Sequence, residues 1–373
     1  MIYLDHAATT PVPRAVADAM YEVLTEQFGN PSSQYPMGLE MKRRVEVWRK
    51  TVADALGCGA KQLFFTSCGT EADNWAVTAA CWQNRHLGRH IVTTAVEHSA
   101  VLEACRWMER QGYEVTYLVP AQDGSLSAEQ VLAAVRQDTA LVSCMLVNNE
   151  LGTLQPVKEA AQAIKDARCP ALLHCDAVQA FLKVPFIPKE LGVDLLTISG
   201  HKIRAPKGIG AQYIRKGLDV KPLLLGGGQE NGLRSGTEPT AQLAALAAAC
   251  AAWDPDAPAR MAAVKAHALE VLATVPGLEI INAGDAPHIC AVSLPGYPSE
   301  MLVRELSDRG VYVSSGSACH RGKPSHVFAA LGLPKRTLMG VLRVSFSPES
   351  TRADVDALAG GLTEITKTRI AAR

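Results

Sequence analysis

The sequence predicts an α/β protein, with a large domain built on a mainly parallel sheet and a smaller α+β domain. Between Leu63 and Ile214, short apolar segments of strand length alternate with segments of helical periodicity. Turn-forming residues at 254–258 then precede a second run of helices and strands. The chain has 373 residues, of which 48% are hydrophobic. It is therefore long and apolar enough for one large core or two smaller ones.

Two amphipathic helices are predicted before the first strand, because apolar residues recur there with helical spacing. The apolar positions are Val16, Met20, Val23, Leu24 and Phe28 in the first helix, and Met41, Val45, Trp48, Val52 and Leu56 in the second.

Strands are predicted for six apolar segments. A helix from about Glu71 follows the first segment, and a helix through Trp107 follows the second. The segments are Leu63–Thr66, His90–Thr94, Ala140–Val147, Ala171–Cys175, Asp194–Ser199 and Gly210–Ile214. Because these segments are apolar throughout rather than alternating, we expect helices on both faces of a largely parallel sheet.

A domain boundary is predicted after the alanine-rich segment Gln242–Trp253, because Asp254–Pro258 interrupts its helical pattern. The elements expected beyond it are a helix at Met261–Leu272, strands at Leu278–Ile281 and Cys290–Leu294, a helix at Ser299–Arg309, a strand at Val311–Ser314 and a helix from Arg352. We therefore predict a large domain over residues 15–253 and a small domain formed by residues 1–14 and 254–373.

Composition excludes several classes of partner. The 37 basic and 37 acidic side chains balance, so no overall field attracts nucleic acid or an anionic membrane. No apolar run reaches the roughly 18 residues that span a bilayer, and the N-terminus has no secretory pattern. The ten cysteines show no C-x-x-C spacing, which argues against a zinc site or a disulfide framework. We expect a cytoplasmic protein whose partners are small molecules or proteins.

Two polar residues follow neighbouring apolar strands and together suggest a cofactor. Asp176 ends one strand, and Lys202 stands in a turn after another, where ligands of α/β sheets bind. Taken singly, the aspartate could cap a helix and the lysine could be a solvated surface charge. As a pair, a lysine that forms an imine and an aspartate that faces a pyridine nitrogen are what a pyridoxal phosphate (PLP) enzyme needs.

A phosphate site is predicted at Thr66–Asn74, where a strand leads through small residues into a helix. Backbone N–H groups and hydroxyls at a helix start bind phosphate well, although the turn could simply be a capped helix start. The glycine-rich segment Gly226–Gly228 and the following Arg234–Thr237 are a weaker candidate of the same kind.

A reactive cysteine is predicted in the small-residue loop after Val311–Ser314. Cys319 stands beside His320, Arg321 and Lys323, and such a basic environment favours the thiolate. Most of the other cysteines lie in apolar periodic segments, where we expect them to pack as small hydrophobic residues.

With these residues assembled, the sequence closely resembles the NifS/IscS-type cysteine desulfurases, which belong to class V of the fold-type I PLP enzymes. The motifs that carry the resemblance are Tyr3–Pro11, Phe28–Ser33, Thr66–Asn74, Glu97–Val101, Val147–Glu150, Asp176–Gln179, Ser199–Lys202, Arg234–Thr237, Ser314–Cys319 and Arg343. They cover nearly the whole chain. The resemblance implies a seven-stranded, mainly parallel sheet in the large domain.

The resemblance also implies a role for each motif residue. Lys202 would hold PLP covalently and later remove the substrate Cα proton, Asp176 would pair with the pyridine nitrogen, His98 would stack on the ring, and Gln179 would bond its phenolic oxygen. The phosphate would be held by Gly69, Thr70, Ser199 and His201, and by Thr237 from the other subunit of a homodimer. Asn149 and Arg343 would bind the substrate carboxylate, and Cys319 would accept sulfur. No metal is implied.

The implied reaction converts L-cysteine to L-alanine, with sulfur passing to Cys319 as a persulfide. An acceptor protein would then take the sulfur for iron–sulfur clusters, tRNA thiolation or another thio-cofactor. The alternatives are a selenocysteine lyase, an aminotransferase or kynureninase-like lyase that does not need Cys319, and a PLP-free scaffold subunit. Intact Lys202, Asp176, His98 and Cys319 argue against the last.

The sequence departs from the family pattern in two places. Cys68 and Gly69 stand where glycine and alanine are common, and we expect the phosphate turn to survive, with Cys68 as a spectator. The segment after Cys319 is shorter and more basic than in the housekeeping members, and we expect no C-terminal docking tail of the kind those members carry. We therefore expect the core reaction, with the identity of the acceptor left open.

Overall fold

A seven-stranded sheet forms the centre of the larger part of the molecule. The computed structural model describes residues 1–315 and 325–371. The strand order is β2-β8-β7-β6-β5-β3-β4, and only β8 runs antiparallel to its neighbours. The strands are β2 (Leu63–Thr66), β3 (His90–Thr94), β4 (Glu114–Leu118), β5 (Thr139–Ser143), β6 (Leu172–Asp176), β7 (Leu195–Ser199) and β8 (Gly210–Ile214). The predicted α/β class is confirmed.

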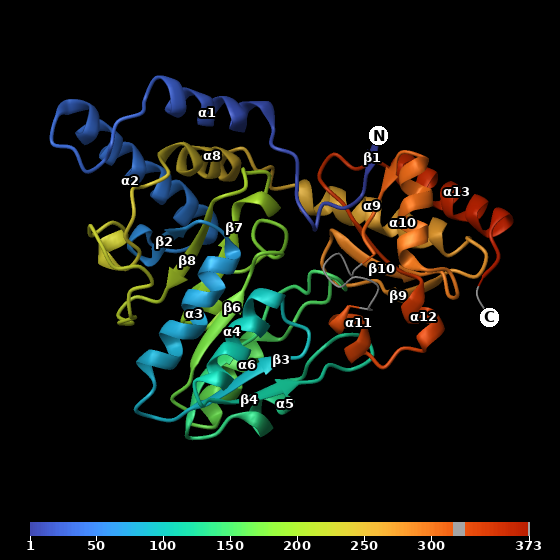
Figure 1. Ribbon diagram of the computed structural model, residues 1–373, viewed down its shortest axis with the longest axis horizontal. Helices are drawn as coiled ribbons and strands as arrows, with labels where there is room; N and C mark the ends of the chain where they lie inside the picture. Colours follow the sequence, from blue (N-terminus) through green and yellow to red (C-terminus); the bar gives the residue numbers. More distant parts are fainter. Residues whose placement is uncertain (316–324, 372–373) are drawn as a thin grey trace.

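Helices cover both faces of this sheet, as its apolar strands predict (Figure 1). On β3, Ile91 packs with α3 and α4, whereas its neighbour Val92 belongs to the core under α2, α6 and α8. The helices of this part are α1 (Arg14–Thr25), α2 (Pro36–Leu56), α3 (Gly69–Gln83), α4 (Ser99–Arg110), α5 (Ala128–Ala134), α6 (Val157–Asp166), α7 (Pro188–Leu191) and α8 (Thr240–Ala251), with short 3₁₀ turns η1 (Ala60–Gln62), η2 (Gly200–Lys202) and η3 (Glu230–Gly232).

A second, smaller group of elements lies to one side of the large sheet (Figure 1). Its antiparallel sheet has the order β12-β10-β9, and β1 pairs with β11 in parallel. The elements are β1 (Ile2–Tyr3), α9 (Ala257–Leu272), β9 (Glu279–Asn282), β10 (Ile289–Ser293), α10 (Ser299–Asp308), β11 (Val311–Tyr312), α11 (His326–Ala330), α12 (Lys335–Met339), β12 (Val341–Ser345) and α13 (Arg352–Thr368).

The N-terminus packs with this smaller group. Leu4 belongs to a hydrophobic cluster whose other buried members lie between residues 268 and 365. The predicted division into residues 15–253 and residues 1–14 with 254–373 stays a prediction, and this separate core supports it. No helix in the described parts of the chain is long and apolar enough to cross a membrane.

The structure corrects several predicted elements. The first helix ends at Thr25, so Phe28 lies outside it and is exposed. The strand predicted to reach Val147 ends at Ser143. Pro258, predicted to lie in a turn, lies in the first turn of α9, where a proline is tolerated because the backbone N–H groups there have no partner within the helix. Strands β4 and β12 and helices α5 and α6 are absent from the prediction. Strand β4 lies at the sheet edge with mostly half-exposed side chains, so it lacks a continuous apolar signal.

Candidate active site

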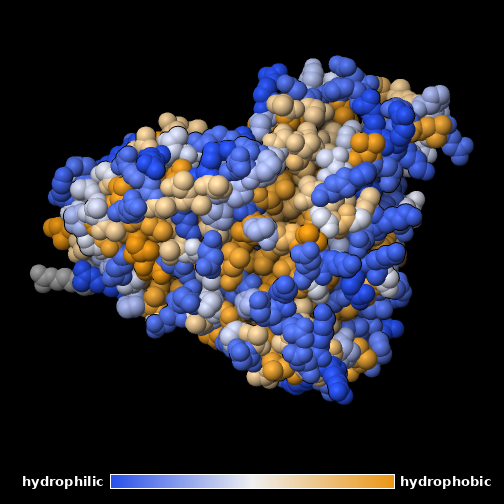
Figure 2. Space-filling view, turned by 180° about the vertical axis from the view of Figure 1, so that it is seen from behind, coloured by the Kyte–Doolittle hydropathy of each residue, from blue (hydrophilic) through white to orange (hydrophobic). Residues whose placement is uncertain are grey.

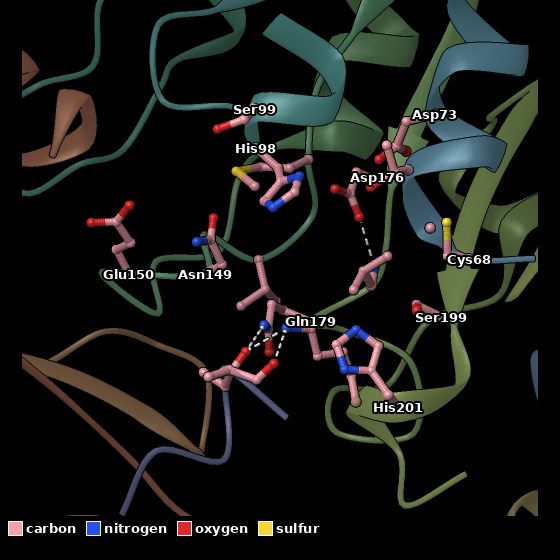
Figure 3. A pocket seen from close by; sticks show the side chains of 18 of the residues that line it. Cys68, Asp73, His98, Ser99, Asn149, Glu150, Asp176, Gln179, Ser199 and His201 are labelled. Carbon is pink, nitrogen blue, oxygen red and sulfur yellow. Dashed lines mark hydrogen bonds between the residues drawn. The ribbon is translucent and has the colours of Figure 1, made fainter. Parts of the chain in front are cut away.

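A cavity of about 340 Å³ opens where the central parallel strands end. Asp176 is the last residue of β6 and Ser199 the last of β7, and Lys202 ends the turn that follows. Since parallel strands bring their carboxyl ends to one edge, these side chains meet there. Figure 3 shows Asp176 and Ser199 around one hollow, with His98 above and His201 below, and Lys202 also lines it.

Most of the predicted site residues line this cavity. They are Gly69, Thr70, His98, Asn149, Asp176, Gln179, Ser199, His201, Lys202 and Arg343. Thr237 lies elsewhere, on a neighbouring cavity with Ser67 and Arg234. Cys319 lies outside the described residues. The structure therefore brings ten of the predicted residues together within one chain.

The Lys202 amine is held beside the N-terminal segment. It donates hydrogen bonds of 2.6 Å to the Ala7 carbonyl and 2.8 Å to the Ala8 carbonyl. Burial, assisted by the charge of Arg343, lowers the pKa of Lys202 to about 8, against the opposing pull of Asp176 and Asp5. An amine with a lowered pKa supplies its neutral, nucleophilic form more readily.

Asp176 is a buried carboxylate at the cavity wall. It accepts a hydrogen bond of 2.8 Å from the Val178 N–H, and the residues after it form a turn rather than a helix. The alternative that Asp176 caps a helix is therefore wrong. Burial raises its pKa, while the charges of His98 and Lys202 and the Val178 N–H act in the opposite direction. A cation bound in the cavity would restore its ionised form.

The start of α3 forms the third side of the cavity. Cys68 precedes the helix without a side-chain capping bond, and its thiol reaches the cavity wall. A Cβ added to Gly69 would lie 3.0 Å from Cγ2 of Val178 and 3.4 Å from Cβ of Ser199. The helix start is thus packed closely against the ends of β6 and β7. The first N–H groups of a helix suit an anion.

Two of the histidines that line the cavity, His98 and His201, favour their neutral forms. His98 is the N-cap of α4, and its Nδ1 accepts a hydrogen bond of 3.2 Å from the Ala100 N–H, which leaves the proton on Nε2. Burial lowers the pKa of His98. Burial and the charge of Lys202 lower the pKa of His201 to about 4, and its Nδ1 lies 3.2 Å from Oγ1 of Thr9.

Arg343, on β12, reaches the cavity from the smaller group of elements. Its Nη2 donates a hydrogen bond of 2.7 Å to Oδ1 of Asp5, and its Nη1 donates one of 3.0 Å to the carbonyl of Asn149. Its Nε and Oδ1 of Asn149 are buried without a partner among the described residues. Asp5, which sequence reasoning left without a role, therefore orients the guanidinium.

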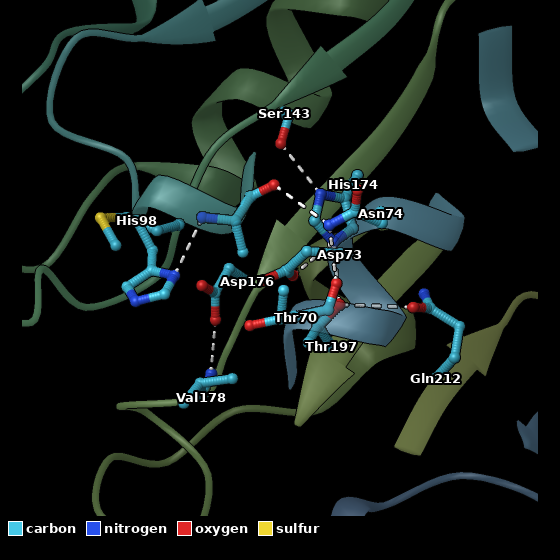
Figure 4. A network of polar contacts seen from close by, with 12 residues as sticks. Thr70, Asp73, Asn74, His98, Ser143, His174, Asp176, Val178, Thr197 and Gln212 are labelled. Carbon is cyan, nitrogen blue, oxygen red and sulfur yellow. Dashed lines mark hydrogen bonds and ion pairs between the residues drawn. The ribbon is translucent and has the colours of Figure 1, made fainter. Parts of the chain in front are cut away.

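Three further acidic residues, two lining the cavity and one next to His98 in the sequence, have no role assigned from the sequence. Asp73 lines the cavity beside Asp176 (Figure 4), and its Oδ1 is 3.6 Å from Nε2 of His174. Glu150 also lines the cavity, and Glu97 adjoins His98 in sequence. All three stand inside the motifs quoted above. Their acidic character at buried positions was the signal that could have singled them out.

Both glutamates are buried and hydrogen-bonded. Oε1 of Glu97 accepts a bond of 2.7 Å from the Met145 N–H, and burial raises the pKa of this carboxyl to about 8. Oε1 of Glu150 accepts a bond of 2.8 Å from the Ser325 hydroxyl, and burial raises its pKa to about 7. Burial thus favours the neutral form of both carboxyl groups relative to a carboxyl in water.

The residues of the cavity fit PLP. A buried carboxylate matches a pyridine nitrogen, a lysine with a lowered pKa matches an aldehyde, and the helix start with Thr70 and Ser199 matches a phosphate. Together with the central sheet, this set defines the fold-type I class of PLP-dependent enzymes.

Comparison with known proteins identifies the family. The profile of the class-V aminotransferases matches residues 2–358. A cysteine desulfurase IscS of Methanosarcina thermophila is 40% identical over 98% of this chain and 91% of its own length, and a cysteine desulfurase of Nostoc sp. is 41% identical over 98% and 92%. The chain belongs to the class-V aminotransferase family, among the NifS/IscS-type cysteine desulfurases.

Solved structures agree with this assignment. A NifS-like protein superposes with a TM-score of 0.93 at 35% identity, covering 99% of this chain and all of that one. SspA in complex with cysteine superposes with a TM-score of 0.84 at 32% identity, over 94% of this chain and 100% of its own. The predicted family and enzyme class are confirmed.

Proposed function

We propose that this enzyme uses PLP to convert L-cysteine to L-alanine and passes the sulfur to Cys319. The observation that carries the proposal is the meeting of Lys202, Asp176 and the α3 start in one cavity, with Arg343 at its rim. Relatives named cysteine desulfurase and the cysteine complex of SspA support L-cysteine as the substrate.

In this proposal the cavity residues hold PLP at three points. Asp176 would pair with the ring nitrogen, Lys202 would hold the aldehyde carbon, and Gly69, Thr70, Ser199 and His201, which line the same cavity, would hold the phosphate. His98 would stack on the ring and Gln179 would bond its phenolic oxygen. When bound, PLP withdraws electrons from the substrate Cα and weakens the bonds there.

The substrate carboxylate binds Arg343 and Asn149. The guanidinium is oriented by Asp5 and by the Asn149 carbonyl, so its remaining N–H groups present a preset face to an anion. Nζ of Lys202 then takes the Cα proton, because its lowered pKa leaves part of the amine unprotonated.

Cys319 takes the sulfur by nucleophilic attack. Its thiolate forms an S–S bond with the substrate sulfur while the Cβ–S bond breaks, and the electron pair of that bond stays with the three-carbon product. One proton added at Cβ, and the return of the proton held on Nζ of Lys202 to Cα, complete L-alanine. The basic residues next to Cys319 in the sequence favour the thiolate that this step requires.

We propose a homodimer in which Thr237 serves the cavity of the other subunit. Within its own chain Thr237 lies off the Lys202 cavity. Large apolar side chains are exposed on α1, on α2 and between them, namely Tyr21, Leu24, Phe28, Tyr35, Met37 and Leu39. Light scattering would give twice the chain mass if the proposal holds, and a monomer that still binds PLP fully would contradict it.

We also propose a protein as the sulfur acceptor and the cytoplasm as the place of reaction. The basic segment His320–Lys323 favours an acidic surface on that acceptor. On the face of the molecule opposite to Figure 1, apolar and polar side chains are interspersed, with apolar patches near the middle (Figure 2).

The decisive experiment measures alanine and sulfide released from L-cysteine by the PLP-loaded protein under a thiol reductant. Equal amounts from the wild type, and neither from Cys319→Ser, are expected. Cys58→Ser is the matched control, since Cys58 lines a different cavity. Alanine from Cys319→Ser at the wild-type rate would contradict the sulfur-transfer step, and no alanine from any variant would contradict the whole proposal.

A further inference from the structure

A buried lysine without a carboxylate partner lies beside the site. Lys183 is only 4% exposed, in the turn region after β6. Its amine donates a hydrogen bond of 3.4 Å to Oε1 of Gln179, and it forms no ion pair with any residue in the ranges 1–315 and 325–371. Burying an amine in this way is costly, so its position calls for a functional reason.

The Gln179 amide has donors on one side and an acceptor on the other. His288 also contacts Oε1 of Gln179, through its Nε2 at 3.2 Å. On the other side, Nε2 of Gln179 donates a hydrogen bond of 2.9 Å to the Ala7 carbonyl. A carbonyl oxygen can only accept, so the NH₂ group must face Ala7 and the amide oxygen must face Lys183 and His288.

This orientation points the amide NH₂ toward the reactive lysine. The same Ala7 carbonyl accepts a hydrogen bond of 2.6 Å from Nζ of Lys202, and Gln179 lines the cavity (Figure 3). An amide NH₂ carries two N–H groups, and one of them is used by Ala7. The second is therefore left for an oxygen atom of a molecule in the cavity.

We propose that Lys183 is a positioning residue that holds the Gln179 amide with its NH₂ group toward the PLP cavity. The inference rests on the proposed function, in which Gln179 bonds the phenolic oxygen of PLP. If the amide turned over, its oxygen would face that electron-rich oxygen instead. Burial and the charge of Lys202 lower the pKa of Lys183 to about 7. Both the ammonium and the neutral amine carry N–H groups, so Lys183 can donate in either form.

The test measures the dissociation constant of PLP by titrating the apoprotein and following absorbance. Lys183→Met removes the donor and keeps the length of the side chain, and about tenfold weaker binding is expected, the size of one hydrogen bond. In a Gln179→Ala background the same substitution should change nothing further, because the two residues act through one contact. Unchanged binding in Lys183→Met, or additive losses in the double variant, would overturn the proposal.

Lys265→Met is the matched control. Lys265 is also buried, at 6% exposed, but it donates to the carbonyls of Gly284 and Ala286, away from the cavity. It should lower the melting temperature without changing the PLP dissociation constant or the pH at which the PLP absorbance changes. An equal effect of Lys265→Met on PLP binding would mean that Lys183→Met acts through general loss of packing, and would overturn the proposal.

Two further measurements keep the inference separate from folding and from the proposed function. If Lys183→Met does not fold, Gln179→Glu tests the same contact, since its carboxylate accepts from Lys183 but has no N–H for the cavity. Wild-type PLP affinity in Gln179→Glu would overturn the inference. Failure of the wild-type protein to bind PLP would instead contradict the proposed function itself.

Discussion

At the residue scale, other residues of the chain hold the guanidinium of Arg343, the group that we propose binds the substrate carboxylate. Nη2 of the guanidinium donates a hydrogen bond to Asp5, and Nη1 donates one to the Asn149 carbonyl. The three residues come from the N-terminus, the middle and the C-terminal part of the chain. The freedom of the Arg343 side chain is therefore reduced in advance, which would strengthen the binding of a carboxylate in the proposed role.

Arg343→Lys is expected to raise the KM for L-cysteine by about 10–100-fold, because a lysine cannot form the bidentate pair. The measurement is the initial rate of alanine formation over a range of L-cysteine concentrations. Arg309→Lys, in an ion pair at Glu305 outside the cavity, serves as control. A KM unchanged by Arg343→Lys would remove Arg343 from the substrate site.

Asp176→Asn is expected to lower kcat by at least about a hundredfold, since an amide cannot balance the charge of a protonated ring nitrogen. Lys202 is untouched, so the protein should still bind PLP and show its absorbance. The matched control is Asp18→Asn on the surface of α1. Full activity in Asp176→Asn would show that the carboxylate does not face the ring nitrogen.

At the element scale, each group of strands and helices has its own core. Leu302 on α10 is fully buried in the cluster that also contains Leu4 and Leu342. This cluster packs behind β12, the strand that carries Arg343. Its packing therefore supports the rim of the cavity without touching a ligand.

Leu302→Ala is expected to lower the free energy of unfolding by about 2–5 kcal/mol, through lost apolar burial and the cavity left behind. Denaturant unfolding of the apoprotein measures it. Leu132→Ala on α5 is the control, because Leu132 is 45% exposed and should cost far less. Equal losses in the two variants would mean that the Leu302 side chain is not packed in this core.

At the scale of the whole molecule, the cavity is made where the two groups of elements meet. Ala7, Ala8, Ser314, Ser325, His326 and Arg343 line it together with residues from the ends of the large sheet. Glu97 is fully buried close to this region, because its backbone carbonyl oxygen lies 2.9 Å from Nε2 of His326. Ionisation of its carboxyl therefore bears on the stability of the whole apoprotein.

The free energy of unfolding of Glu97→Gln is expected to rise relative to that of the wild type as the pH rises from about 4.5 to about 8. Burial raises the pKa of Glu97 in the folded state to about 8. The protonated Glu97 carboxyl therefore contributes its full stabilisation below the unfolded-state pKa of about 4.3. This contribution is lost as the pH rises to the folded-state pKa. Glutamine does not titrate, so the difference grows by at most about 1.4 kcal/mol per pH unit.

Denaturant unfolding of both apoproteins at several pH values measures this difference. Glu103→Gln, at an exposed position on α4, should follow the wild type throughout. A constant difference between Glu97→Gln and the wild type across this range would show that the buried carboxyl ionises as it does in water.

Local pattern was enough to predict some elements and too little for others. The continuous apolar run of β3 predicted a buried strand, and it is one. Strand β4 was missed because an edge strand keeps half-exposed side chains. Phe28 was placed in the first helix because its spacing fits, yet the helix ends at Thr25 and leaves the ring exposed. Periodicity records which residues can be buried, not where a helix stops.

The sequence by itself determined the α/β class, the family and the residue types that the chemistry needs, because motif residues and their order are visible along the chain. Only the tertiary structure decided that Asp5 orients Arg343, that Thr237 lies off its own cavity, and that Lys183 is buried against Gln179. These contacts join segments brought together only by folding. The burial that shifts the pKa of Lys202 and Glu97 likewise exists only once the core has closed around them.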